Sequence, residues 1–372
     1  MLVVGGGVMG CATAYFLARA GVRVTLVEQH RVGGPPSASG ASAAILEALA
    51  GHPVPVAQQG QLSRRLIGEL APRLLEETGI DVEFQRLGSI HLAFSERDAA
   101  GLRARVPALF AGLGEATEWL DSAAVRAAEP AAPARLFGGL LIPSTNGVYA
   151  PKYVRALAAG AARHAARILQ GVSVTGFEVE GERVAAVQTS EGRIAAGQVL
   201  LATGAWTGLV ARGLGCDVPV GPQRGQIAAL APAPGEPRVA HVVHGPGGYI
   251  IPKANGTACV GATHEFVGFD ARVTTYGLKF VADLALRLAP GLETAALKHI
   301  WMGFRPVMLR EALSPVGALP GLRNAYVAAG HGAIGLTLSA GVGKTMAQLI
   351  RGETPDLSLA AFDPANVVGS PG

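Results

Sequence analysis

The apolar positions of this chain fall into short runs and into longer segments with helical spacing. Near the N-terminus, an apolar run at residues 2–4 leads into glycines at 5–7, and a helical pattern follows over residues 11–20. A second apolar run, over residues 22–28, ends at Glu28. Because each run has the length of a buried strand, the order strand, helix, strand predicts a βαβ unit of a parallel sheet.

Two kinds of segment alternate along the rest of the chain. Amphipathic helices and continuous apolar strands are predicted at residues 55–78, 151–167, 198–203, 325–329 and 335–351. Short strands are predicted at residues 89–94, 136–142, 172–178, 184–189, 226–230, 241–243, 248–252 and 258–262, with helical segments between the first two and after residue 276. This alternation predicts an α/β domain that is interrupted by a second domain. Residues 353–372 are polar and contain prolines, so a loose tail is expected there.

Composition narrows the classes of function. With 372 residues, two domains are favoured over one. Hydrophobic residues make up 49% of the chain and charged residues 16%, so it can build a large core and is not a disordered chain. The formal net charge of +4 is not concentrated in basic runs, and aromatic residues make up only 5%. These two features argue against nucleic-acid binding.

The cysteines bear on the cellular compartment. Cys11, Cys216 and Cys259 include no C-x-x-C pair, and an odd number is a poor disulfide framework, so a reducing, cytoplasmic location is predicted. No signal peptide is expected, because the glycine motif begins almost at once. Residues 325–343 are apolar but contain His331 and several glycines. We therefore expect a buried strand, loop and helix there and no transmembrane segment.

The glycines at 5, 7 and 10 form a Gly-x-Gly-x-x-Gly motif between the first predicted strand and helix. The first glycine permits a tight turn, the second lets the backbone approach a pyrophosphate, and the third lets the helix pack on the strand. Glu28 ends the second strand and can accept a hydrogen bond from a ribose 2′-hydroxyl, which disfavours NADP. The motif predicts a bound dinucleotide but does not separate NAD from FAD.

Three later segments bear on that choice. Residues 37–44 (SASGASAA) form a small-residue loop that can lie against a phosphate and a flavin ring, or can be a flexible surface loop. Residues 200–206 (LLATGAW) end a buried strand where parallel sheets bind ligands, although an ordinary turn has the same pattern. Residues 329–337 (AGHGAIGLT) open a late helix, whose N-terminus can stabilise a reduced flavin or a second phosphate.

These segments occur in the order found in the glycine oxidase, D-amino-acid oxidase and sarcosine oxidase family of FAD proteins, which the chain resembles along nearly its whole length. The matching segments are VVGGGVMG at 3–10, Glu28, ASGASAA at 38–44, LLATGAW at 200–206, PQRGQ at 222–226, GGYIIP at 247–252, VGATHE at 260–265, GFRP at 303–306 and AGHGAIGLTLS at 329–339. The N-terminal motif is shared with many flavoproteins, whereas this ordered set is specific to the family.

The resemblance implies an α/β fold in which a Rossmann-like FAD-binding domain is interleaved with a substrate domain. The substrate domain is expected to be an α+β unit with a mixed antiparallel sheet topped by helices. We assign residues 1–80, 146–220 and 300–372 to the discontinuous FAD-binding domain. Residues 81–145 and 221–299 are assigned to the substrate domain.

The resemblance also implies catalytic residues. The arginine of the G-x-R-P segment grips the substrate carboxylate in this family, and it corresponds to Arg305. A planar guanidinium suits a carboxylate, although a surface ion pair is the alternative. Tyr249 is expected to help hold the substrate, or else to pack in the sheet. His264 is expected near the substrate, where it contacts the substrate or is buried in the core. No role is assigned to His244.

The residues that the resemblance implies for FAD lie in the glycine motif, the acid that follows it, the small-residue loop, the strand end and the late glycine-rich turn. They are Gly5, Gly7, Val8, Met9, Gly10, Glu28, Gln29, Ser39, Ser42, Ala43, Ala44, Val174, Thr203, Gly204, Trp206, Gly330, His331, Gly332, Ile334, Gly335, Leu336 and Thr337. His331 is expected to offer its backbone to the flavin and not to act as a base.

Two departures from the sarcosine oxidases refine this picture. Those enzymes attach the flavin to a cysteine in the segment that corresponds to residues 307–325, which contains none here, so non-covalent FAD is predicted. They also place an oxygen-activating lysine at the position of Cys259. The replacement weighs against a sarcosine oxidase and leaves the reaction with oxygen open.

The implied reaction is oxidation of the C–N bond of a small amino acid or amine. Hydride passes to the flavin, and the imine product hydrolyses. One alternative is a dehydrogenase, including a subunit of a complex acting on proline, hydroxyproline or a D-amino acid. Another is a non-catalytic flavin-bearing subunit, against which Arg305 and Tyr249 argue. No metal-ligand spacing is visible. The electron acceptor, oxygen or another, and the choice between a homo-oligomer and a hetero-complex stay open.

Overall fold

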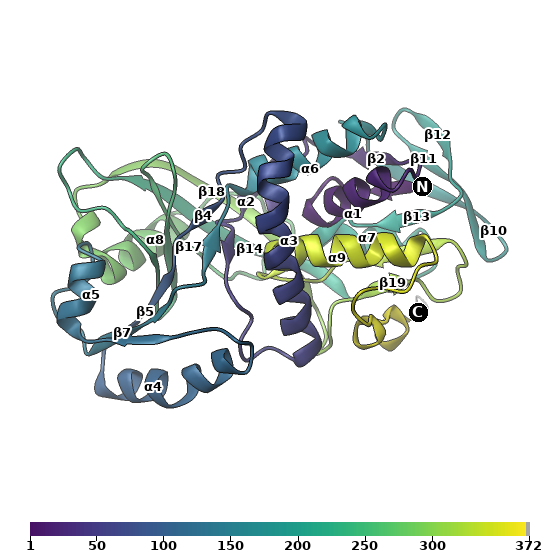
Figure 1. Ribbon diagram of the computed structural model, residues 1–372. Coiled ribbons are helices and arrows are strands. Elements are labelled where there is room, and N and C mark those ends of the chain that lie inside the picture. The colour runs from purple at the N-terminus through teal and green to yellow at the C-terminus, as the bar shows by residue number, and fades with distance from the viewer. Residues whose placement is uncertain (370–372) are drawn as a thin grey trace.

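The structure, a computed structural model, describes residues 1–369 and contains two large sheets that lie side by side (Figure 1). The first is a six-stranded sheet in which neighbouring strands run parallel except for the edge pair β19 and β20. In spatial order its strands are β19 (Val316–Ala318), β20 (Ala325–Ala328), β13 (Val199–Leu201), β1 (Leu2–Val4), β2 (Thr25–Glu28) and β9 (Arg167–Gln170).

Long helices cover this parallel sheet. In Figure 1, α1 (Val8–Arg19), α6 (Ala150–Arg163) and α9 (Gly335–Ile350) pack together, and α3 (Val54–Thr78) runs across them. The four-residue leucine spacing of α3 explains its burial, because Leu66, Leu70 and Leu74 all face the core. This core is the largest apolar cluster of the chain, and it fixes the strand ends to which the glycine motif is attached.

The second sheet has eight strands that pair antiparallel, apart from the parallel pair β15 and β5. In spatial order they are β18 (Ala296–Met308), β14 (Val220–Ala231), β17 (Ala258–Gly261), β16 (Gly248–Pro252), β15 (Val242–Gly245), β5 (Ser89–Ala93), β7 (Gly138–Ile142) and β6 (Glu118–Leu120). One face is apolar, with Val243, Ile250 and Val260 packed against α8 (Thr275–Leu288). The opposite face is free to meet the first sheet.

Smaller elements connect these layers. Two three-stranded sheets consist of β10 (Val174–Glu180), β11 (Arg183–Thr189) and β12 (Gly192–Ala195), and of β3 (Ile45–Leu46), β8 (Asn146–Gly147) and β4 (Gln85–Arg86). The remaining α-helices of the described residues are α2 (Ala38–Ala41), α4 (Glu96–Ala111), α5 (Ser122–Ala128) and α7 (Thr207–Arg212). In the part of the chain that is described, no helix combines the length and the apolar character that a membrane crossing needs.

The predicted fold class is confirmed, since a parallel α/β sheet is joined to a mixed, mainly antiparallel sheet with helices. Some element boundaries were wrong. The helix predicted to reach residue 167 ends at Arg163, and β9 then begins. The strand predicted at residues 226–230 extends much further as β14, and no strand was predicted where β18 lies. The domain division stays a proposal, and its boundary at 299/300 falls inside β18.

The expected loose tail is wrong for the residues up to 369. Phe362 is buried in the main core, and Pro364 lies against Gly317. Gly369 also forms a bridge with Asp217. Three prolines and several polar residues gave residues 353–372 the composition of a tail, whereas the contacts of Phe362, Pro364 and Gly369 hold the described part against the fold.

Candidate functional site

A long cavity lies where the two sheets meet. On one side it is lined by the residues at the carboxyl ends of parallel strands, including Gly5 after β1, Glu28 at the end of β2 and Ala202 after β13. On the other side it is lined by side chains from the eight-stranded sheet, among them Tyr249 and Arg305. Parallel sheets place their ligands at the carboxyl edge, so the position itself points to a binding site.

The glycine motif shapes the first end of the cavity. Gly5 has a φ of +107°, and a Cβ there would lie 2.4 Å from the carbonyl oxygen of Ala202. A Cβ on Gly10 would lie 1.9 Å from the carbonyl oxygen of Gly5, which shows how closely α1 approaches the turn. The helix therefore begins directly at the cavity, where its first amides and the helix dipole favour an anion.

The acid predicted to bind a ribose is held by the backbone. The carboxylate of Glu28 accepts hydrogen bonds from the amide of Gly6 at 2.7 Å and from the amide of His30 at 2.8 Å. Both bonds come from the turns beside the strand ends, so the carboxylate has a fixed position on the wall of the cavity. An acid fixed at the end of the second strand is what the dinucleotide-binding interpretation of the Gly-x-Gly-x-x-Gly motif predicts.

The small-residue loop over residues 37–44 is fixed in place and is not a flexible surface loop. The hydroxyl of Ser37 caps α2 by accepting from the amide of Gly40 at 3.0 Å, and that of Ser39 accepts from the amide of Val8 at 3.0 Å. Trp301 Nε1 donates to the carbonyl of Ala41 at 3.1 Å. The loop lines the cavity from Ser37 to Ala44, apart from Gly40.

The late glycine-rich turn closes the same cavity. Gly335 and Leu336 line it at the N-terminus of α9, and His331 lies just before them. His331 is buried, and neither ring nitrogen has a hydrogen-bond partner within residues 1–369. Burial lowers the pKa of His331 to about 4, so its imidazole is neutral at physiological pH. The two ring nitrogens of His331 without partners at the cavity wall indicate that the cavity binds a polar ligand.

Arg305 provides the positive charge at the other end of the cavity. Its Nη1 donates to the carbonyl of Thr263 at 2.9 Å and to Oε1 of Gln223 at 3.4 Å. Burial lowers its pKa, and within the described chain no carboxylate pairs with it. A guanidinium that is partly shielded from water and has no counter-ion is unfavourable, so the site suits an anionic ligand.

Gly225 makes room for this guanidinium. Strands β14 and β18 place Gly225 diagonally beside Arg305, and a Cβ at Gly225 would lie only 2.5 Å from Nη1 of Arg305. The side chain therefore lies flat over the glycine, with its donors directed along the cavity wall. The sequence showed this glycine only as part of the PQRGQ segment.

Tyr249 and His264 complete this end of the site. Both line the cavity together with Arg305. Burial, partly offset by the charge of Arg305, raises the pKa of Tyr249 to about 12, so its hydroxyl stays a neutral donor. Burial and the charge of Arg305 lower the pKa of His264, whose Nδ1 lies 3.0 Å from Oε1 of Gln223. Gln223 thus joins His264 to Arg305, a link that the sequence did not reveal.

Most of the residues predicted from the sequence meet at this cavity. All three candidate catalytic residues line it, as do all the candidate cofactor residues except four. The four are Gly10, Gly330, Ile334 and Thr337. Thr337 lies next to the lining residues and donates to the carbonyl of Ile45 at 3.1 Å. Further lining residues that the sequence analysis did not single out include Phe304, Gly225 and Ile227.

The comparison with known proteins decides the family. The model of the DAO family, described as FAD dependent oxidoreductase, matches residues 1–349. The chain belongs to this family. A glycine oxidase from Geobacillus kaustophilus (strain HTA426) is 33% identical over 376 residues, which cover 100% of this chain and 97% of the relative. The predicted FAD-dependent enzyme class is thereby confirmed.

Solved structures agree with this placement. The crystal structure of glycine oxidase from Geobacillus kaustophilus superposes with a TM-score of 0.91 and 32% identity, covering 97% of each chain. The crystal structure of iminodiacetate oxidase (IdaA) from Chelativorans sp. BNC1 gives a TM-score of 0.90 at 26% identity and covers 98% of each chain. The protein is a glycine oxidase-like FAD-dependent oxidoreductase.

The cavity fits FAD. The N-terminus of α1 and the carboxylate of Glu28 suit the pyrophosphate and the ribose of the adenosine half. The loop through Ala43 and Ala44 leaves space for a flat ring, and His331, whose ring nitrogens lack partners, lines the same cavity. Glycine positions too tight for a Cβ and small side chains keep the wall of the cavity close to the backbone, as a bound dinucleotide would require.

Proposed function

We propose that this enzyme oxidises the C–N bond of glycine or of another small amino acid, including N-substituted ones such as iminodiacetate. The observation that carries the proposal is Arg305, a half-buried cation without an anionic partner among the described residues, on the wall of the flavin cavity. A substrate carboxylate supplies the missing charge through a bidentate contact. Names of relatives support the same substrate class.

The side chains around Arg305 orient the substrate. Tyr249 donates its hydroxyl to the carboxylate that Arg305 holds, because its raised pKa keeps the proton in place. The side chains of Ile227 and Phe304 form apolar walls that exclude water. His264 remains neutral because its pKa is lowered, so it adds no charge that would repel the substrate amine.

FAD, when bound, would supply a hydride acceptor, and Arg305 and Tyr249 would position the carbon next to the amine and provide the electrostatics for its oxidation. The amine has to be uncharged when the hydride leaves. We propose no general base for its proton, because Tyr249 keeps its own proton and the lowered pKa of His264 makes its imidazole a weaker base. Solvent is the proton acceptor in this scheme.

The proposal is tested by anaerobic mixing of the purified flavoprotein with a panel of substrates while the flavin absorbance is followed. The panel contains glycine, sarcosine, iminodiacetate, D-alanine, L-proline and methylamine, which lacks a carboxylate. We expect rapid bleaching by at least one carboxylate-bearing amine and none by methylamine. Bleaching by methylamine at the same rate as by glycine, or no bleaching by any member, contradicts the proposal.

The same experiment identifies the electron acceptor. Readmitting air recolours the flavin within seconds if the enzyme is an oxidase, and hydrogen peroxide accumulates. Slow recolouring together with fast reoxidation by an artificial dye identifies a dehydrogenase. The substrate assignment is independent of this second result, since it depends on the reductive step alone.

A further inference from the structure

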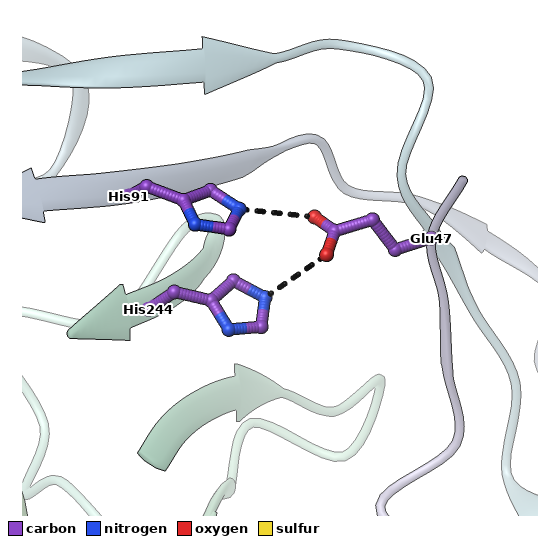
Figure 2. Close-up of side chains that lie close together, drawn as sticks. All are labelled: Glu47, His91 and His244. Atoms are coloured by element: carbon purple, nitrogen blue, oxygen red, sulfur yellow. Dashed lines mark hydrogen bonds and ion pairs between the residues drawn. The ribbon is translucent and has the colours of Figure 1, made fainter. Parts of the chain in front are cut away.

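Outside the flavin cavity, Glu47, His91 and His244 bring three side chains together (Figure 2). His91 lies on β5 and His244 on β15, and the two are directly paired in the parallel register of these strands. Glu47 follows β3, the short strand that leaves the flavin-binding loop. The three residues are far apart in the sequence, so no spacing motif indicates the cluster.

Both histidines of the cluster direct a ring nitrogen toward the carboxylate of Glu47. Nε2 of His91 lies 3.3 Å from Oε1 of Glu47, and Nε2 of His244 lies 3.7 Å from Oε2 of the same carboxylate. The two imidazole rings are stacked with their centroids 4.4 Å apart and an angle of 18° between the planes. All three potential ligand atoms lie within 4.8 Å of one another, so both rings point their Nε2 atoms at one carboxylate (Figure 2).

Hydrogen bonds between these residues do not satisfy the cluster. Nε2 of His244 is buried and has no hydrogen-bond partner within residues 1–369, because its distance to Glu47 is too long. One imidazole would be enough to hold the carboxylate of Glu47 in place by a hydrogen bond, whereas here two stacked imidazoles face it. A buried polar atom that is aimed at a carboxylate and lacks a partner indicates a missing ligand.

The surroundings of Glu47 resemble those of a metal-ligating carboxylate. The hydroxyl of Ser89 donates to Oε1 of Glu47, and that of Thr145 donates to the same atom at 3.1 Å. Such outer hydrogen bonds fix the orientation of a ligating group. They leave Oε2 directed toward His244 and free to bind.

The cluster lies near the surface and outside the flavin cavity, which is lined by other residues. The side chains of His91, Glu47 and His244 are 26%, 19% and 21% exposed. Because Nε2 of His244 itself is buried, entry of an ion requires local movement of these side chains. His244 is directly paired with Tyr249, and their rings lie 6.3 Å apart, so the cluster is adjacent to the substrate end of that cavity.

We propose that Glu47, His91 and His244 bind one divalent transition-metal cation, with Zn²⁺ as the reference ion. Two imidazoles and a carboxylate suit Zn²⁺, Cu²⁺ or Ni²⁺, whereas Mg²⁺ and Ca²⁺ prefer oxygen ligands alone. Ligands about 2.1 Å from a zinc ion lie roughly 3.0–3.4 Å apart. The observed 3.3 Å and 3.7 Å thus require only small side-chain rotations.

The test is isothermal titration of the FAD-bound protein, without substrate, with ZnCl₂ and in parallel with MgCl₂. We expect one tight Zn²⁺ equivalent that is lost or weakened at least about tenfold in Glu47→Gln and in His244→Asn, and no Mg²⁺ binding. The matched control is His164→Asn, which removes the imidazole of another histidine–carboxylate pair, His164 and Glu77, 3.7 Å apart. That variant should bind Zn²⁺ like the wild type.

Retention of the flavin spectrum shows that each variant is folded. If Glu47→Gln does not retain FAD, the same titration is made with His91→Asn and Ser89→Ala. A smaller loss of Zn²⁺ affinity is expected for Ser89→Ala. The proposal is overturned if the wild type binds no Zn²⁺ at micromolar concentration, or if its Zn²⁺ is lost in Cys259→Ser but kept in His244→Asn. Because no substrate is present, this result is separate from the outcome for amine oxidation.

Discussion

The two ends of the flavin cavity recognise their ligands in different ways. At the end proposed for the nucleotide, the wall consists of the backbone at the start of α1, tight glycine turns and one carboxylate that is itself held by amides. At the substrate end, the groups are side chains from strands of the mixed sheet, centred on the unpaired charge of Arg305. The first end therefore depends on backbone conformation, and the second on a few side chains.

This difference predicts how each end responds to mutation. Loss of one side chain at the nucleotide end leaves most of the amide contacts in place, so the effect should be small. Loss of the one cation at the substrate end leaves nothing to replace it. The following predictions test that contrast, beginning with the largest expected effect.

Replacing Arg305 by alanine should lower kcat/KM for a carboxylate-bearing amine by about 10²- to 10³-fold, because removal of one partner from a buried ion pair costs roughly 3–5 kcal/mol. The flavin absorbance should be unchanged, which steady-state kinetics and a spectrum of the purified variant will show. Arg310→Ala is the control, since the pair of Arg310 with Asp217 is exposed. An activity of Arg305→Ala within about twofold of the wild type contradicts the substrate assignment.

Replacing Gly225 by alanine should raise KM by about 10- to 100-fold. The new Cβ would lie 2.5 Å from Nη1 of Arg305, so the guanidinium has to leave its position. Gly101→Ala in α4 is the control, because a Cβ there meets no heavy atom within 4 Å. Unchanged kinetics in Gly225→Ala would show that the guanidinium position is not critical.

The buried His331 makes the stability of the protein depend on pH. Its pKa is lowered by burial to about 4 from 6.5, so the unfolded state binds a proton first as the pH falls. Its contribution to stability is present above pH 6.5 and is lost progressively between 6.5 and 4. From pH 7.5 to pH 5 this loss should be about 2 kcal/mol.

Urea unfolding at the two pH values measures that loss, and His331→Asn should show a smaller difference between them. An equal pH dependence in the variant and the wild type would assign the acid sensitivity to other groups. His244 is one such group, because burial lowers its pKa to about 4 as well.

Replacing Ser39 by alanine should weaken FAD binding by only about fivefold. The hydroxyl of Ser39 accepts one hydrogen bond from the amide of Val8, and such a bond contributes about 1 kcal/mol. Ser95→Ala is a control, since Ser95 caps α4 away from the cavity. Fluorescence titration of the deflavinated protein with FAD measures both. A loss of a hundredfold or more in Ser39→Ala would remove the contrast between the two ends.

Much of the fold could be predicted from local patterns in the sequence. The strand before Gly5, the helix after it and Glu28 at the end of β2 were predicted because each depends on neighbours along the chain. Errors arose where an element depends on distant partners. Strand β14 extends far beyond the predicted residues 226–230, and β18 was not predicted, because each strand supplies the hydrogen bonds of the other.

The sequence by itself determined the βαβ unit, the dinucleotide motif and, through the order of its motifs, the family, because backbone turns and buried strands leave a local pattern of glycines and apolar residues. Only the tertiary structure decided that Gly225 makes room for Arg305, that Gln223 joins Arg305 to His264, and that Glu47, His91 and His244 converge. These contacts are set by strand register between segments far apart in the chain. Residues that meet through register carry no local spacing from which their meeting could be predicted.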